Sequence, residues 1–181
     1  INFANGDYIS FINADDYYEH KSFEKITEKL DLERPDVLYA DLDYIDNNRQ
    51  VRRCWRPGKF DKKKLQDLWI SPHPTTFIRT DLVKKFSGFD IKYKLAADYD
   101  LLLKVLSSAE KVVYFDTVVV KMRLGGATNV TWQNIFKQNM EIFRSYRSHF
   151  NNCPLRKFLN KLVNRLVQII RAKLKIGNTN G

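Results

Sequence analysis

Residues 8–16 read Tyr-Ile-Ser-Phe-Ile-Asn-Ala-Asp-Asp, an apolar, β-rich run that stops abruptly at polar side chains. A buried strand has this pattern when it delivers polar groups to the edge of an α/β sheet. Asp15 and Asp16 are therefore expected at the carboxyl end of a strand. Ligands of open α/β sheets bind beyond that end, so the stretch predicts both the fold class and the place of the site.

The following segments continue the pattern of an α/β domain. Ser22 is expected to cap a helix that carries Phe23, Ile26 and Leu30 at helical spacing, and residues 37–40 read as the next strand. The order of strand, helix and strand favours a mainly parallel sheet with C-terminal helices. Further along, we predict a polar loop over 46–59, a short helix at 62–69, a strand at 75–78, a helix over 80–86 capped by Thr80 or Asp81, a helix from Asp98, strands at 112–115 and 118–120, and helical sequence from 131 to about 175.

The charge of the chain is concentrated at its C-terminal end. The net charge is +10, and from Lys137 onward ten basic residues face a single acid, Glu141. This last part therefore carries +9, and residues 1–136 carry +1. We expect a nearly neutral globular body over 1–136 and a basic helical extension over 137–181.

The pair Asp15–Asp16 is the first candidate site. Two adjacent carboxylates repel each other, so they are best explained by a cation or a set of donors that offsets the repulsion. A hard divalent ion that bridges carboxylate and phosphate oxygens fits this place. The alternative is that both acids only cap the segment that follows.

A second acidic cluster, Asp98 and Asp100, lies where an apolar helix begins. Side chains two positions apart point in different directions on a helix, so only one of the two can face a site. A carboxylate held beside a substrate can serve as a general base, and the alternative is a helix cap. Asp41 and Asp43 follow a predicted strand, and we expect them in a solvated loop.

Two further residues have an open interpretation. His73 lies between two prolines and is either a hydrogen-bonded structural residue or part of the site. Arg123 precedes the pair Gly125-Gly126, and an arginine beside close-approaching backbone suits a phosphate. The alternative for Arg123 is an ordinary surface position.

Four segments of the chain occur together in an order that is itself informative: residues 4–18, residues 71–79 ahead of Gly88-Phe89-Asp90, residues 97–101 and residues 123–126. In this order and spacing they resemble family 2 glycosyltransferases of the kind that build bacterial surface polysaccharides. The resemblance covers roughly residues 1–130.

The resemblance implies a GT-A-like, Rossmann-like fold and an inverting transfer from a nucleotide diphosphate sugar to a hydroxyl of a saccharide or lipid-linked acceptor. Asp16 would ligate Mn²⁺ or Mg²⁺, Asp15 would contact the ribose or the metal shell, and Asp98 would be the catalytic base. Arg123 and His73 are candidate donor-binding residues. The chain departs from the family pattern at Asn13 and Ala97, where acidic residues are frequent.

Family members carry further strands ahead of residues 4–18, which hold the nucleotide base. The resemblance therefore implies an N-terminally truncated sheet, whose exposed edge favours self-association, and weak or absent transfer by the chain alone. The rival hypothesis from another class is a non-catalytic remnant that serves as a binding or scaffold domain.

Residues 155–175 carry an apolar stripe at helical spacing, flanked by Lys and Arg. This pattern favours either peripheral contact with an anionic membrane surface or packing on the body. We predict no nucleic-acid partner, because no recognised binding motif occurs. Cys54 and Cys153 lack metal-ligand spacing, and the simplest location is the cytoplasm, with peripheral contact at the inner face of the membrane.

Overall fold

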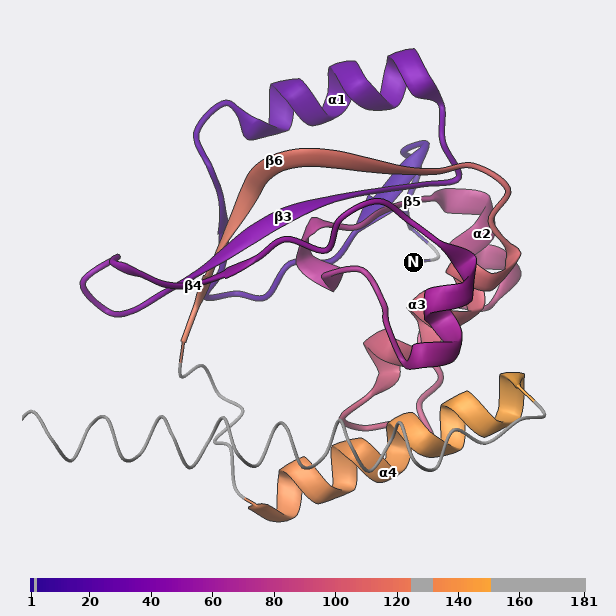
Figure 1. Ribbon diagram of the computed structural model, residues 1–181. Coiled ribbons are helices and arrows are strands. Elements are labelled where there is room, and N and C mark those ends of the chain that lie inside the picture. Colours follow the sequence, from indigo (N-terminus) through magenta and orange to yellow (C-terminus); the bar gives the residue numbers. More distant parts are fainter. Residues whose placement is uncertain (2, 125–131, 151–181) are drawn as a thin grey trace, which may run out of the picture.

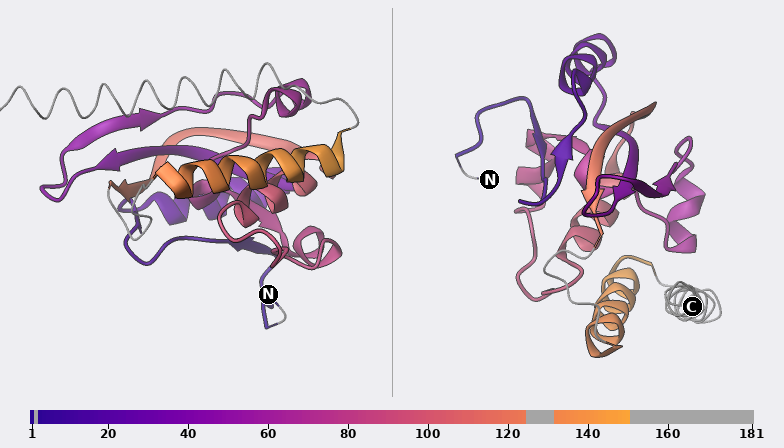
Figure 2. Two further views of the ribbon diagram at one scale, coloured as in Figure 1. Left: turned by 90° about the horizontal axis from the view of Figure 1, so that it is seen from below. Right: turned by 90° about the vertical axis from the view of Figure 1, so that its left-hand side faces the viewer.

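The computed structural model describes residues 1, 3–124 and 132–150 of the chain. A six-stranded sheet lies between helix α1 on one face and helices α3 and α4 on the other (Figures 1 and 2). In chain order the elements are β1 (Tyr8–Ser10), β2 (Tyr17–Tyr18), α1 (Ser22–Glu33), β3 (Val37–Ile45), β4 (Val51–Trp55), the 3₁₀ turns η1 (Lys62–Asp67) and η2 (His73–Thr75), β5 (Phe77–Arg79), α2 (Thr80–Lys85), α3 (Ala97–Ser108), β6 (Val112–Arg123) and α4 (Trp132–His149).

The sheet is mixed, which corrects the prediction of a mainly parallel one. Its strand order is β1-β5-β3-β6-β2, and β4 pairs with β3 off this path. Only β3 and β6 pair in parallel, whereas β1–β5, β5–β3, β3–β4 and β6–β2 pair antiparallel. The predicted strand–helix–strand unit is present, because two antiparallel pairings leave β1 parallel to β3. Strand β5 comes from later in the sequence and separates them.

Strand β3 shows how the two faces of the sheet are built. Side chains alternate along a strand, and Leu38, Ala40 and Leu42 pack with Ile26 and Leu30 of α1. On the other face, Val37 packs with the apolar residues of α3. Full burial of each large side chain contributes about 1.5–3 kcal/mol, so these two layers fix α1 and α3 against the sheet.

Helix α4 packs against α3. Its residues Ile142 and Tyr146 belong to the same apolar cluster as Leu102 and the other buried residues of α3. The start of the predicted basic extension, from Lys137 to His149, thus packs on α3, and a domain boundary at residue 137 stays a prediction. The membrane-contact stretch 155–175 and the glycine pair Gly125-Gly126 lie outside the described residues. Within the described ranges, none of the helices is long and apolar enough to cross a membrane.

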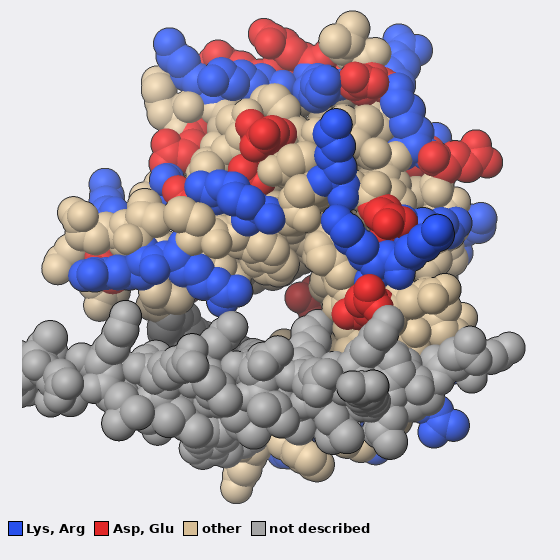
Figure 3. All heavy atoms as spheres, in the orientation of Figure 1, with Lys and Arg blue, Asp and Glu red and all other residues tan. Residues whose placement is uncertain are grey.

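Basic and acidic side chains are interspersed over the face of the body shown in Figure 3. This agrees with the charge of only +1 over residues 1–136. β1 and β2 lie at the two ends of the described sheet, and self-association through the β1 edge stays a prediction.

Several local predictions were wrong, for identifiable reasons. Strand β4 lies inside the predicted loop 46–59, because most of its side chains are exposed and give no apolar pattern. Ser22 does not cap α1, since its hydroxyl donates to the carbonyls of Glu19 and Val119. Thr80 likewise donates to the Gly6 carbonyl instead of capping α2.

Candidate functional site

The fold brings together three predicted site residues from distant segments. His73 begins η2, and its Nδ1 lies 3.5 Å from Oδ2 of Asp98 at the start of α3. Burial lowers the pKa of His73, while the carboxylates of Asp98 and Asp16 act in the opposite direction. The imidazole is therefore neutral at neutral pH. A neutral imidazole can donate one hydrogen bond to a carboxylate and accept another from a ligand.

Asp98 and Asp100 point to different sides of α3, as predicted. The N-cap of α3 is Ala96, and no side chain of the cap accepts a hydrogen bond from the helix, so Asp98 is not the cap. Its side chain is 39% exposed beside His73. Asp100 is buried, accepts from the Ser145 hydroxyl at 2.7 Å and pairs with Lys104 at 2.6 Å. Asp98 is available to a ligand, and Asp100 is structural.

Asp16 is held in place by two hydrogen bonds. Its Oδ1 accepts from the backbone N–H of Arg123 at 3.1 Å, and its Oδ2 accepts from the side-chain amide of Asn13 at 2.8 Å. Burial raises the pKa of Asp16, although both hydrogen bonds lower it. Asp15 lies exposed beside it. Arg123 thus reaches the site through its backbone, at the end of β6.

The described residues contain no group of three or more His, Cys, Asp or Glu side chains that could hold a metal ion. A site with fewer protein ligands still suits Mg²⁺, which is often bound by one or two carboxylates together with substrate phosphates and water. The adjacent carboxylates of Asp15 and Asp16 fit a divalent ion of that kind, and they do not fit a cage formed by protein alone.

An apolar pocket adjoins the His73–Asp98 pair. Phe11 and Phe89 meet edge to face on its wall with their ring centroids 4.6 Å apart, and Thr76, Ile78, Leu101 and Leu102 complete the lining. His73 and Asp98 are the ionisable groups that line it. The pair therefore borders both solvent and an apolar surface, which strengthens its electrostatic interactions with a bound substrate.

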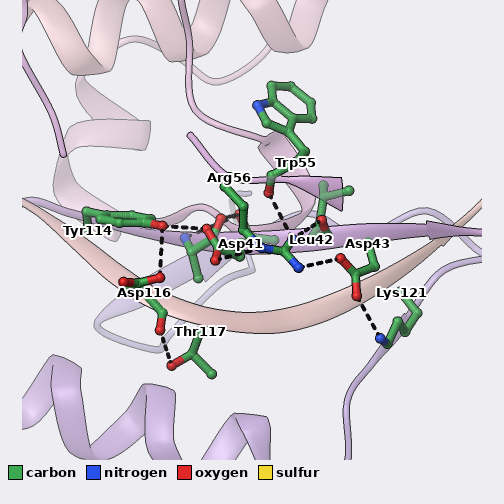
Figure 4. A network of polar contacts seen from close by, with 11 residues as sticks. Asp41, Leu42, Asp43, Trp55, Arg56, Tyr114, Asp116, Thr117 and Lys121 are labelled. Atoms are coloured by element: carbon green, nitrogen blue, oxygen red, sulfur yellow. Dashed lines mark hydrogen bonds and ion pairs between the residues drawn. The ribbon is translucent and has the colours of Figure 1, made fainter. Parts of the chain in front are cut away.

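The sequence-based interpretation missed a polar network around Asp41 and Asp43 (Figure 4). Both acids are buried within β3, not in a solvated loop. Arg56 contacts both of them, at 3.2 Å and 2.7 Å, and Lys121 donates to Asp43 at 2.9 Å. The spacing of two residues on a strand puts both acids on one face, but nothing in the sequence pattern identified their cationic partners.

Comparison with known families assigns the first part of the chain. The sequence profile described as "Glycosyl transferase family 2" matches residues 1–86. These residues belong to glycosyl transferase family 2. They include Asp15, Asp16 and His73 of the candidate site, and Asp98 lies 12 residues beyond them.

Two curated relatives are glycosyltransferases. The uncharacterized glycosyltransferase MJ1057 of Methanocaldococcus jannaschii is 24% identical over 157 residues, which cover 84% of this chain and 53% of that protein. The uncharacterized glycosyltransferase RT0329 of Rickettsia typhi is 32% identical over 132 residues, covering 67% of this chain and 41% of that protein. The chain spans about half the length of the curated relatives it matches.

Solved structures confirm the GT-A-like fold that the family implies. S. aureus TarS matches with a TM-score of 0.61 at 19% identity, over 91% of this chain and 29% of TarS. TarS 1-349 in complex with UDP-GlcNAc matches with a TM-score of 0.59 at 18% identity, over 80% of this chain and 44% of that chain. At this identity the match shows the fold alone.

Proposed function

We propose that the protein transfers a sugar from a nucleotide diphosphate sugar to a hydroxyl of a saccharide or lipid-linked acceptor, in the synthesis of a surface polysaccharide. One observation carries the proposal. On a family 2 fold, Asp98 is partly exposed, does not serve as a helix cap and lies 3.5 Å from His73, whose pKa Asp16 also influences. The structural neighbour TarS has been crystallised with UDP-GlcNAc and with UDP, which supports a uridine diphosphate sugar as the first donor to test.

Asp98 is the base in this mechanism. Its carboxylate accepts the proton of the acceptor hydroxyl as that oxygen attacks the anomeric carbon of the donor. The new glycosidic bond forms while the bond from the anomeric carbon to the phosphate oxygen breaks, and the electron pair leaves with the nucleoside diphosphate. Attack from the face opposite the leaving group inverts the anomeric configuration. Positioned proton transfer of this kind contributes about 10²–10⁴-fold to a rate.

The remaining residues serve the leaving group and the alignment of the base. Asp16, with Asp15 beside it, would hold Mn²⁺ or Mg²⁺ against the diphosphate, and this ion supplies positive charge that stabilises the departing nucleotide. Arg123 holds Asp16 through its backbone and leaves its exposed guanidinium for a phosphate. Neutral His73 contacts Asp98 and would bind the donor by a hydrogen bond.

Calorimetric titration of UDP into the protein, expressed from its complete reading frame, tests the proposal. We expect binding with Mn²⁺ that weakens strongly without it and in Asp16→Ala. The matched control is Asp31→Ala, an exposed aspartate of α1 on the opposite face of the sheet. Absence of metal-dependent binding in a folded sample would contradict the proposal and favour a non-catalytic remnant that acts as a binding domain.

A further inference from the structure

Glu141 of α4 contacts the backbone that leads into α3. Its Oε2 accepts the N–H of Leu95 at 2.7 Å and the N–H of Ala96 at 3.0 Å. Glu141 is the one acid among the eleven charged Lys, Arg, Asp and Glu residues from Lys137 onward. The single carboxylate of the basic C-terminal part is thus directed at the helix that carries Asp98.

Two neighbours of Glu141 reach the same segment. The side-chain amide of Gln138 donates to the Leu95 carbonyl at 3.1 Å, and the Ser145 hydroxyl donates to the Asp100 carboxylate at 2.7 Å. Gln138, Glu141 and Ser145 are spaced three and four residues apart, so they lie on one face of α4. Their contacts bracket Asp98 on both sides, at residues 95–96 and at residue 100.

The first turn of α3 has no capping side chain at its N-cap. Ala96 occupies the N-cap and has no side-chain oxygen, so the N-cap makes no side-chain hydrogen bond to the helix. A carboxylate near a helix N-terminus is favoured by the helix dipole as well as by hydrogen bonds. Glu141 supplies that carboxylate from a different helix, by accepting from the N-cap Ala96 and from Leu95 just before it, and Asp98 is the second residue of the helix that follows.

We propose that Glu141 is a positioning residue for Asp98, which holds the first turn of α3 so that the Asp98 carboxylate faces His73 and the acceptor hydroxyl. This inference rests on the proposed function for its catalytic consequence, and on the hydrogen bonds of α4 for its structural one. Helix α4 then belongs to the catalytic unit, not to a separable basic extension that starts at residue 137.

Glu141→Ala tests the catalytic consequence in the protein made from its complete reading frame. A misplacement of about 1 Å costs on the order of 10²-fold in rate, so we expect kcat to fall about 10- to 100-fold with little change in the KM for the donor sugar. Glu141→Gln keeps an acceptor oxygen and should restore most of kcat. The matched control Glu28→Ala removes an exposed glutamate of α1 and should leave kcat unchanged.

The pKa of His73, followed by NMR, tests the structural consequence without any activity. The Asp98 carboxylate raises this pKa, so displacing Asp98 in Glu141→Ala should lower it, whereas Glu141→Gln should leave it near the wild-type value. Equal shifts in the two variants would mean that lost charge, not lost position, is the cause, and would overturn the inference. An unchanged His73 pKa and kcat in folded Glu141→Ala would also overturn it.

The two readouts separate the two proposals. A wild-type protein that transfers no sugar, but whose His73 responds to Glu141→Ala and not to Glu141→Gln, would refute the proposed function and support the positioning role. If Glu141→Ala does not fold, Gln138→Ala breaks a weaker contact to Leu95 in the same set, and it should lower the His73 pKa in the same direction.

Discussion

The carboxylates of β3 and those of the candidate site differ in how far the protein satisfies them. Asp41 and Asp43 have side chains only 3% and 8% exposed, and they accept contacts from Tyr114, Arg56 and Lys121. Asp98 is 39% exposed and faces a neutral histidine at 3.5 Å. The first pair has little capacity left for a ligand, whereas Asp98 keeps most of its hydrogen-bonding capacity.

The difference arises from secondary structure, since both pairs have the same spacing. Residues two apart lie on one face of a strand, so Asp41 and Asp43 share one guanidinium, that of Arg56 (Figure 4). In α3 the same spacing separates Asp98, near the site, from Asp100, in the core. A pair of aspartates therefore indicates a reactive site only once the element that carries it is known.

The largest effect is expected for Asp98→Asn. The substitution removes the proposed base but keeps its shape, so kcat should fall about 10²–10⁴-fold. Because the side chain is partly exposed, the free energy of unfolding should change by no more than about 0.5 kcal/mol. Steady-state kinetics and urea unfolding measure the two quantities. Undiminished transfer by this variant would show that Asp98 is not the base.

The opposite behaviour is expected for Asp43→Asn. The substitution removes the buried charge that Arg56 and Lys121 share, while Arg56 keeps Asp41 and Lys121 keeps Glu19. The free energy of unfolding should therefore fall by about 2–4 kcal/mol, somewhat less than when a buried ion pair loses one partner completely. Urea unfolding measures this, with the exposed Asp31→Asn as control, which should change stability by about 0.5 kcal/mol or less. A loss of transfer without a loss of stability would instead place Asp43 in the site.

The stability of the protein at acid pH should depend on the same network, because Asp43 is protonated there. Burial raises the pKa of Asp43, but hydrogen bonds from Lys121 and Arg56 outweigh it, and the net pKa is lowered from 3.8. Such a group stabilises the fold above its unfolded pKa and loses that contribution as the pH falls through its folded pKa. Stability measured from pH 5 downward should therefore fall less steeply in Asp43→Asn than in the wild type. If stability falls equally steeply with pH in both proteins, Asp43 does not have a lowered pKa in the folded protein.

The smallest expected effect is on His73. Burial holds its pKa below the ordinary value of 6.5, and Asp98 opposes that shift. In Asp98→Asn the pKa of His73 should fall further. The expected change is a fraction of a pKa unit, because an ion pair as accessible to solvent as His73–Asp98 contributes less than about 1 kcal/mol. NMR titration of the three histidines, with His73 assigned by substitution, measures the shift. A rise in the pKa would mean that Asp98 does not face the imidazole.

Sequence patterns predicted the buried elements well and the exposed ones poorly. The apolar spacing of α1 and α3 gave each helix where the structure has one, whereas the run before Asp15–Asp16 gave only a half-buried strand, which ends at Ser10. β4 was missed because its exposed side chains carry no period, and β2 because it has only two residues. The hydrophobic pattern reports burial, so an exposed edge strand leaves almost no trace in it.

The candidate site was predictable as a set of residues but not as an arrangement. Asp16, His73 and Asp98 were each singled out from local patterns, and the structure places them close together. The backbone contact of Arg123 to Asp16 and the side-chain contact of Glu141 to Leu95, just before α3, join residues more than 40 positions apart. Such contacts depend on tertiary packing, which one sequence does not report.

The insertion of β5 between β1 and β3 also determines when the site can form during synthesis. In the described sheet β1 pairs with β5 alone, and Tyr8 lies opposite Arg79, roughly seventy residues later. A chain that emerges from the ribosome N-terminus first therefore has no sheet partner for β1 in these pairings until β5 has been made. The loop that carries Asp15 and Asp16 is anchored at its other end by Arg123, the last residue of β6. The acidic loop is thus translated before β5 and β6, the strands that fix it in place.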